Sequence, residues 1–382
     1  MNTILVGDNV EVLNRVKLER VKVVYLDPPY NTRTCKAYSD SLSSSEYVEH
    51  MYSVLSAVRA QMCNDGVIFV SIDDTMLCAT RSCLDKIFGE MNFVGTFITN
   101  QSKRSNAKLI NTVHEYVLCY SKNKRLLTEF SIKRKQIPEQ RIVIERITSQ
   151  VQRVFEKSGA TKAASRLRAL IKRYGEQPKF AWLKNYKCVD DAGRIFFPTD
   201  LSKIGEPNSV NIPEINLYLE PLPNRRWLSD KLLVKLHNAG MLTKRNGRPY
   251  KKLYLDDAVD NVQSKLDFYS RHGSRDLEKL GLQGVFDTPK PVELIKFLIR
   301  IVGLKSGDTV LDCYGGSGTT AQAVFEINAE DEVELNSVLI QKDEQINPKS
   351  PAYKACLAHG IEPNILAVLN ARVERAQQRL AK

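Results

Sequence analysis

A short acidic turn near the N-terminus has the residue types needed for chemistry on a planar amine. Asp27, Pro28, Pro29 and Tyr30 directly follow the apolar run Val21–Leu26. An amine on an aromatic ring is a weak nucleophile because its lone pair is delocalised into the ring, and accepting its hydrogens localises that pair. Asp27 can accept one hydrogen, and Pro28, which has no N–H, can present a rigid carbonyl to the other. Tyr30 can stack on an extruded base. We therefore predict a catalytic turn, against the alternative of a simple Pro-Pro turn after a strand.

A second loop, near the C-terminus, is rich in glycine and hydroxyl side chains. It follows the predicted strand Val310–Cys313. Glycines allow a ligand to approach the backbone closely, and N–H groups at the start of a helix can bind a carboxylate. The loop is therefore predicted to bind a cofactor through Asp312, Tyr314, Gly316, Ser317, Gly318 and Thr319.

The glycines of this loop also raise the alternative of a nicotinamide enzyme. Such an enzyme has the spacing G-x-G-x-x-G and an acidic residue at the end of the next strand. Here the spacing differs, and the next predicted strand, Ser337–Gln341, ends in a neutral residue. The sequence therefore favours a different cofactor.

Strands and helices alternate at both ends of the chain, as apolar runs and helical spacing indicate. Strands are predicted at Ile4–Val6, Val21–Leu26, Gly66–Ile72, Phe93–Thr99, Val113–Tyr120, Val310–Cys313 and Ser337–Gln341. Helices are predicted at Ser44–Met62, Met76–Phe88, Pro291–Val302, Gly318–Ile327 and Ile365–Leu380. This alternation predicts an α/β fold with a doubly wound, mostly parallel sheet. Ligand sites in such sheets lie outside the carboxyl ends of the strands, where both loops are expected.

The middle of the chain differs in pattern and in charge. Residues 101–285 contain 36 Lys and Arg against 19 Asp and Glu, and the other residues contain 20 against 25. Basic amphipathic helices are predicted at Arg141–Phe155 and Lys162–Tyr174, and a hairpin turn at Asn246-Gly247. Because Lys and Arg neutralise phosphates, this excess predicts nucleic-acid binding.

We therefore expect three segments. Residues 1–125 would form the catalytic half of one sheet domain, and residues 286–382 its cofactor-binding half. Residues 126–285 would be a basic insertion between them that recognises the target.

The composition argues against several other classes of protein. Eight cysteines and five histidines are scattered without metal-ligand spacing, so we expect neither a metal site nor a disulfide framework. No run of 18 apolar residues is present, and the first residues lack the pattern of a secretory signal. We expect a cytoplasmic protein with reduced thiols that is not associated with a membrane.

Several ordered segments together resemble the β-class DNA amino-methyltransferases, and in particular the modification (Mod) subunits of type III restriction–modification systems. The segments that carry the resemblance are Gly7–Asn9, Val24–Thr32, Gly66–Asp74, Ile87–Phe93, His114–Lys122, Phe286–Pro291 and Asp312–Thr320. They follow the family's permuted order, in which the catalytic turn precedes the glycine loop. The resemblance implies S-adenosylmethionine as cofactor and N6 of a flipped-out adenine in double-stranded DNA as acceptor.

The resemblance also implies further site residues. Lys290 would pair with the methionine carboxylate of the cofactor, and Asp8 would lie near its adenine ring. Thr288 and Pro291 belong to the same cofactor-binding segment as Lys290. Gln341 stands where many relatives have a ribose-binding Glu, and its amide can still bond to hydroxyls.

Three other activities stay open at this stage: methylation of cytosine N4, methylation of RNA, and a DNA-binding subunit that does not catalyse. An Asp at the first position of the catalytic turn is typical of adenine enzymes, and Ser of cytosine N4 enzymes. The resemblance further implies a homodimer and a possible restriction subunit as partners. It also implies a location in the cytoplasm of a bacterial or phage-infected cell, in association with the nucleoid.

Overall fold

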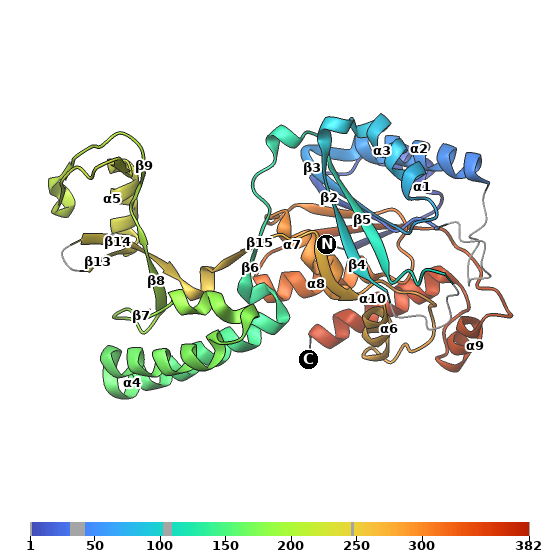
Figure 1. The fold of residues 1–382 in the computed structure, drawn as a ribbon. Helices are drawn as coiled ribbons and strands as arrows, with labels where there is room; N and C mark the ends of the chain where they lie inside the picture. Colours follow the sequence, from blue (N-terminus) through green and yellow to red (C-terminus); the bar gives the residue numbers. More distant parts are fainter. Residues whose placement is uncertain (1, 31–42, 102–108, 246–247, 382) are drawn as a thin grey trace. The chain divides into compact units, whose positions relative to one another are not determined.

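The computed structural model describes residues 2–30, 43–101, 109–245 and 248–381 (Figure 1). The chain divides into two compact units. The sheet unit consists of Met1–Ser131 and Asn261–Lys382, and the inserted unit consists of Ile132–Asp260.

The sheet unit is built on one eight-stranded sheet. In spatial order its strands are β1 (Asn2–Val6), β18 (Asn336–Gln341), β17 (Thr309–Asp312), β2 (Val21–Leu26), β3 (Met62–Ile72), β5 (His114–Ser121), β4 (Phe93–Asn100) and β16 (Lys265–Tyr269). The first five are mutually parallel, β5 is antiparallel to both of its neighbours, and β16 is parallel to β4. The prediction of a mostly parallel, doubly wound sheet is confirmed.

The chain order reverses between β17 and β2. After β17 the chain continues to its neighbour β18, whereas after β2 it continues to β3 on the opposite side. The register pairs Asp312 with Tyr25, so the catalytic turn and the glycine loop leave adjacent strands at nearly the same level. Such a reversal opens a crevice at the carboxyl edge of a sheet.

Helices cover both faces of this sheet (Figure 1). One face carries α1 (Asn9–Arg15), α2 (Ser44–Gln61) and α3 (Leu77–Phe88), and the other carries α7 (Val292–Ile301), α8 (Thr319–Asp331) and α10 (Ile365–Leu380). Two short helices, α6 (Arg271–Glu278) and α9 (Pro351–Ala358), complete the unit.

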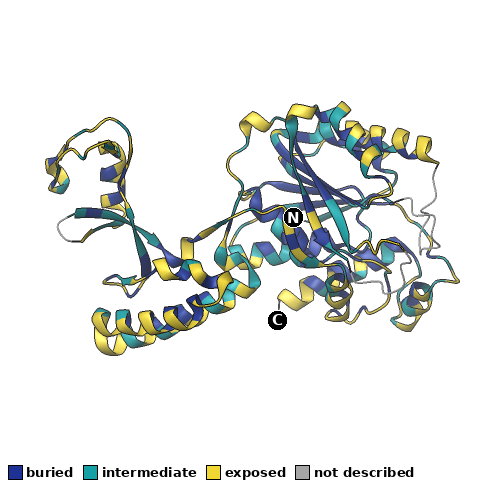
Figure 2. Ribbon diagram, viewed as in Figure 1, coloured by how far each residue is buried: buried dark blue, intermediate teal, exposed yellow. Residues whose placement is uncertain are grey.

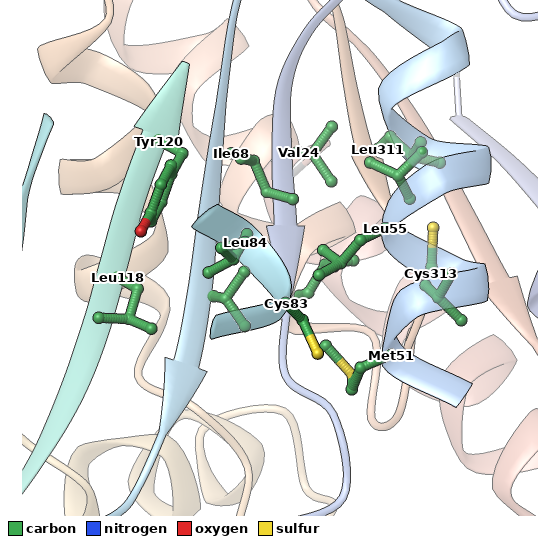
Figure 3. Packing of buried hydrophobic residues seen from close by; sticks show 14 of the residues in the cluster. Val24, Met51, Leu55, Ile68, Cys83, Leu84, Leu118, Tyr120, Leu311 and Cys313 are labelled. Carbon is green, nitrogen blue, oxygen red and sulfur yellow. The ribbon is translucent and has the colours of Figure 1, made fainter. Parts of the chain in front are cut away.

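Burial of apolar side chains against the strands holds these layers together. Figure 3 shows Leu55 of α2 near Val24 and Leu311 of the central strands, and Leu84 of α3 near Ile68; these residues and Met51 belong to one buried cluster. Because the central strands are buried on both faces, they read as continuous apolar runs in the sequence. Figure 2 shows this buried interior beneath exposed outer helix faces.

The inserted unit contains one long helix, one short helix and mostly short strands. Its helices are α4 (Pro138–Gly175) and α5 (Asp230–Asn238), and its strands are β7 (Cys188–Val189), β8 (Ile195–Asp200), β9 (Ser202–Ile204), β10 (Val210–Ile212), β11 (Leu217–Leu219), β12 (Arg225–Trp227), β13 (Leu242–Arg245) and β14 (Arg248–Tyr254). Strands β6 (Ser131–Lys133) and β15 (Val259–Asn261) lie where the chain passes from one unit to the other. The predicted turn at Asn246-Gly247 lies outside the described residues, between the antiparallel strands β13 and β14.

Helix α4 is a helical hairpin. Its backbone leaves the helical conformation at Gly159, where φ is 76°. A hydrogen bond from Arg166 to Gln150 joins the two halves, which bury residues such as Ile147 and Leu167. Both predicted basic helices are therefore confirmed as the two arms of one hairpin.

The inserted unit is shorter than the insertion predicted from the sequence. It ends at Asp260, not at residue 285, because β16 pairs with β4 and so places the following residues in the sheet unit. With these bounds the inserted unit contains 26 Lys and Arg against 14 Asp and Glu. The sheet unit holds 30 of each, so the inserted unit accounts for the whole net charge of +12.

Candidate active site

A cavity opens at the carboxyl edge of the sheet, at the reversal between β2 and β17. It brings together ten of the residues singled out in the sequence, which are Asp27, Pro29, Thr288, Lys290, Asp312, Tyr314, Gly316, Ser317, Thr319 and Gln341. The remaining lining residues are Tyr25, Phe286, Pro289, Gly315, Thr320, Glu344 and Ile365. The two loops, about 280 residues apart in the sequence, therefore share one cavity.

Five other predicted site residues do not line this cavity. Pro28 and Gly318 lie within the two loops, and Pro291 is the N-cap residue of α7. Tyr30 is buried beside the cavity, in contact with Lys290. Asp8 caps helix α1 by accepting hydrogen bonds from two backbone N–H groups, so the structure gives it a local structural role.

Asp8 is also part of an ion pair at the neighbouring strand end. Its Oδ2 lies 2.8 Å from Nζ of Lys342, the residue after β18. Partial burial raises the pKa of Asp8, but Lys342 and the N–H groups of the helix end outweigh burial and lower it overall. The carboxylate is thus ionised and already satisfied by protein groups.

Lys290 is the centre of the catalytic side of the cavity. Its Nζ lies 2.5 Å from Oη of Tyr30, 2.8 Å from Oε2 of Glu115 and 3.3 Å from Oδ1 of Asp27. The contact with Asp27 is an ion pair without hydrogen-bond geometry. Lys290 therefore interacts with the catalytic turn through Tyr30 and Asp27, and with Glu115.

The charges of this cluster depend on one another. Burial raises the pKa of Asp27, and Lys290 partly opposes that effect. Burial also raises the pKa of Glu115, but Lys290 together with hydrogen bonds from Gln101 and Tyr30 outweighs it and lowers the pKa overall. The two carboxylates in turn hold the pKa of Lys290 well above its usual value despite burial. One ammonium thus compensates two nearly buried carboxylates.

Glu115 is a member of this cluster that the sequence did not reveal as a site residue. It lies at the start of β5, and because β5 is antiparallel to β3, its first residues reach the carboxyl edge of the parallel strands. Gln101 donates to its Oε1 at 2.6 Å and Tyr30 donates to its Oε2 at 3.3 Å. The sequence signals were its place in the family-like segment His114–Lys122 and near the start of a predicted strand. The strand direction that brings it to the site was not predicted.

Gly273 positions the segment that carries Lys290. A Cβ atom on this α6 residue would lie 1.8 Å from the carbonyl oxygen of Pro289, which no side chain can tolerate. On the same helix, Asp276 accepts a hydrogen bond of 3.0 Å from the N–H of Val292. Close packing of α6 therefore fixes where Lys290 enters the site.

The glycine loop is held in a tight conformation by Asp312. Its Oδ1 accepts from the N–H of Tyr314 at 2.9 Å and its Oδ2 accepts from the hydroxyl of Thr320 at 2.5 Å. The φ angles of Gly316 and Gly318 are +50° and +80°, a region that side chains disfavour. Burial raises the pKa of Asp312 to about 7, although both hydrogen bonds oppose the shift.

Gln341 supports the glycine loop from the neighbouring strand. Its Oε1 accepts a hydrogen bond of 2.8 Å from the N–H of Gly316, and its Nε2 donates to the carbonyl of Lys342 at 3.0 Å. Both ends of the amide are thus engaged by the protein. The resemblance places Gln341 at a position that binds ribose in many relatives, and in the structure its amide holds the glycine loop.

Tyr314 extends from the glycine loop toward helix α2. Its hydroxyl lies 2.8 Å from Nε2 of His50 and 3.9 Å from the sulfur of Met51. The side chain therefore connects the glycine loop to α2, which lies on the face of the sheet opposite to α8.

Two further findings concern metal sites and membrane spans. Within the described residues, no group of three or more His, Cys, Asp or Glu side chains is arranged to hold a metal ion. The helices described here include none that is both long and apolar enough to cross a membrane.

The chain belongs to the DNA methylase family that comprises N6 and N4 enzymes, which it matches over residues 21–350. It is 28% identical to the Mod subunit of the type III restriction–modification enzyme EcoPI from Escherichia phage P1, over 92% of this chain and 59% of that protein. It is 26% identical to the type II methyltransferase M.KpnI from Klebsiella pneumoniae, over 93% and 84%. The EcoP15I Mod subunit from Escherichia coli is also 26% identical, over 98% and 62%.

These matches confirm the resemblance to Mod subunits that the motifs indicated. The chain spans about six-tenths of the length of the two Mod subunits.

Proposed function

We propose that this protein transfers a methyl group from S-adenosylmethionine to N6 of an adenine in double-stranded DNA. The observation that carries the proposal is the shared cavity, in which Asp27 and Lys290 face the glycine loop of a DNA methylase fold. An amine-accepting group and a cofactor loop are thus adjacent, as direct transfer between two bound molecules requires.

The glycine loop has a donor set that suits S-adenosylmethionine. Ser317 and Thr319 add hydroxyls at the start of α8, where free backbone N–H groups favour a carboxylate. Gly316 and Gly318 leave the backbone open to close approach. When bound, the cofactor supplies an activated methyl group on a sulfonium, and the residues of the chain bind and orient it.

On the catalytic side, Asp27 and the Pro28 carbonyl would accept the two amine hydrogens of a flipped-out adenine, and Tyr30 would stack on its ring. Acceptance of the hydrogens localises the lone pair, and the Asp27 carboxylate faces the positive charge that develops on the nitrogen. Lys290 already occupies one oxygen of Asp27 at 3.3 Å. Base entry must therefore compete with Lys290 for this carboxylate, while Glu115 retains the ammonium at 2.8 Å.

The inserted unit is proposed to recognise the target in duplex DNA. Its second α4 arm buries Ala163, Leu167 and Leu170. Five cations of this arm are exposed, which are Lys162, Arg166, Arg168, Lys172 and Arg173, and Arg166 also donates to Gln150 of the first arm. A row of exposed cations on a rigid helix can follow a phosphate backbone, and such contacts give affinity without sequence information.

Replacement of Asp27 tests the catalytic assignment. Asp27→Ala should abolish transfer of labelled methyl groups to DNA, while the Kd for S-adenosylmethionine in calorimetry stays within about threefold. Asp74→Ala is a matched control, because Asp74 is exposed at the end of the neighbouring strand β3 and does not line the cavity. Methylation by Asp27→Ala at a rate near that of the wild type would overturn the assignment.

The acceptor is identified by digestion of the product to nucleosides. N6-methyladenosine from duplex DNA is expected; N4-methylcytosine, or transfer to RNA alone, would replace the acceptor in this proposal with another. Absence of transfer to any nucleic acid by the wild type would favour a DNA-binding subunit that does not catalyse.

We also propose a homodimer, and a restriction subunit as a further partner, from the Mod relatives. Light scattering after size-exclusion chromatography should give twice the chain mass of 43.3 kDa. A monomer that methylates DNA at full rate would contradict the dimer. The proposed location is the cytoplasm, in association with the nucleoid.

A further inference from the structure

Arg372 of helix α10 lies directly behind the glycine loop. Its side chain has no exposed surface. Its Nη1 donates to Oγ of Ser317 at 2.8 Å and to Oγ1 of Thr319 at 2.7 Å, and its Nε donates to Oε1 of Gln322 at 2.8 Å. Its Nη2 is buried and has no hydrogen-bond partner among the described residues.

These hydrogen bonds determine how the two hydroxyls are oriented. A guanidinium group can only donate, so Ser317 and Thr319 must accept from Arg372. The hydroxyl hydrogens of Ser317 and Thr319 then point away from Arg372. The two oxygens are 3.4 Å apart, so at most one hydroxyl can donate to the other. At least one O–H is therefore left to donate toward the cavity that both residues line.

Among the residues that the structure describes, no carboxylate forms an ion pair with Arg372. Burial lowers its pKa to about 10, against the opposing effect of Asp276 and Glu326, so the guanidinium stays protonated at neutral pH. Gln322 connects it indirectly to Glu326, to which Gln322 donates at 2.9 Å. A buried cation without a direct counter-ion is destabilising, and an anion bound on the far side of the two hydroxyls would offset that cost.

Lys290 is poorly suited to be the group that attracts such an anion. Its ammonium is already shared by Asp27 and Glu115, so that small cluster carries a net negative charge. On the glycine-loop side of the cavity, the outward-facing hydroxyls and the start of α8 favour an anion. The side of the cavity that favours an anion is therefore the glycine-loop side, behind which Arg372 lies.

We propose that Arg372 is a positioning residue that makes the site select the carboxylate of the cofactor. It turns Ser317 and Thr319 into outward donors and polarises them with a buried positive charge. This inference rests on the proposed use of S-adenosylmethionine and extends it to a residue outside both loops.

The test compares two ligands that differ in the carboxylate alone. Binding of S-adenosylhomocysteine and of its decarboxylated analogue is measured by calorimetry for the wild type, Arg372→Met and Arg372→Lys. Loss of a charge-assisted interaction should weaken S-adenosylhomocysteine binding by Arg372→Met about tenfold or more, and binding of the decarboxylated analogue by less than about twofold. Arg372→Lys keeps the positive charge and should keep most of the preference.

Arg375→Met is the matched control. Arg375 lies on the same helix but donates to the carbonyls of Leu280 and Gly281, away from the glycine loop. It should leave the ratio of the two affinities unchanged. If circular dichroism shows that Arg372→Met does not fold, the double variant Ser317→Ala/Thr319→Val removes the hydroxyls instead and should cause the same loss of preference.

Equal weakening of both ligands would overturn the proposal, because it would indicate a distorted loop and not selection of a carboxylate. An unchanged preference in Arg372→Met, or the absence of any preference in a wild type that binds both ligands, would also overturn it while the proposed function stands. A wild type that binds neither ligand would instead refute the cofactor assignment of the proposed function.

Discussion

Removal of Lys290 is the most informative perturbation of the candidate site. In the variant Lys290→Met, Asp27 and Glu115 lose the ammonium that lies 3.3 Å and 2.8 Å from them. At an effective dielectric constant of about 20, these distances correspond to attractions of about 5 and 6 kcal/mol. Desolvation of the three charges cancels much of this, and breaking a buried ion pair by removing one partner costs about 3–5 kcal/mol. We expect a loss of unfolding free energy in that range at pH 8.

The unfolding free energy lost in Lys290→Met should depend on pH in a defined direction. Without Lys290, the two carboxylates repel each other, so the pKa of one of them rises above its value in the unfolded chain. The native variant then binds more protons than the unfolded variant as the pH falls, and its stability relative to the wild type improves. The cost of Lys290→Met should therefore be smaller at pH 5 than at pH 8.

Urea unfolding followed by circular dichroism at both pH values measures these quantities. Arg15→Met is the control, because Arg15 forms an ion pair with Glu11 in which both side chains are exposed, and such pairs contribute at most about 1 kcal/mol. In the double variant Lys290→Met/Glu115→Gln, part of the stability should return, since only one carboxylate remains unpaired. The reasoning is refuted if Lys290→Met is as stable as the wild type at pH 8, or if its cost grows as the pH falls.

Three further predictions concern the cofactor loop and the inserted unit. Burial raises the pKa of Asp312 to about 7, so ionisation of its carboxyl destabilises the fold increasingly between about pH 4 and 7. Over this interval, the unfolding free energy of Asp312→Asn in urea should rise by up to about 4 kcal/mol relative to that of the wild type. A fall relative to the wild type would contradict the assigned cause. Gln341→Ala removes the hydrogen bond to Gly316 and should weaken S-adenosylmethionine binding about two- to tenfold in calorimetry, whereas unchanged binding would show that the loop holds its shape without it. The double variant Lys162→Gln/Lys172→Gln should reduce the slope of log K against log salt by about 1.8 in DNA-binding titrations, and an unchanged slope would place the DNA elsewhere.

Local patterns in the sequence were sufficient for several features of the fold. The apolar runs at Val21–Leu26 and Val310–Cys313 predicted the strands that carry the two loops, because strands buried on both faces show this pattern regardless of their partners. The Ser43–Glu46 capping box marks the start of α2, which was predicted at Ser44. Charge is also a property of the sequence alone, so the basic character of the middle segment could be read directly.

The limits of the insertion could not be read in the same way. Nothing local distinguishes β16 from the preceding residues of the insertion, and only its pairing with β4 assigns it to the sheet. The predicted boundary at residue 285 therefore differed from the observed end of the inserted unit at residue 260.

The sequence by itself determined which residues are available for chemistry: the Asp-Pro-Pro-Tyr turn, the glycine loop and their order. Only the tertiary structure decided which of them meet. It brought Glu115 to Lys290 across 175 positions and Arg372 to Ser317 across 55, and it assigned Asp8 to a helix end. The physical reason is that composition and periodicity report a residue's own surroundings, whereas ion pairing and hydrogen-bond direction depend on which distant strands and helices are packed side by side.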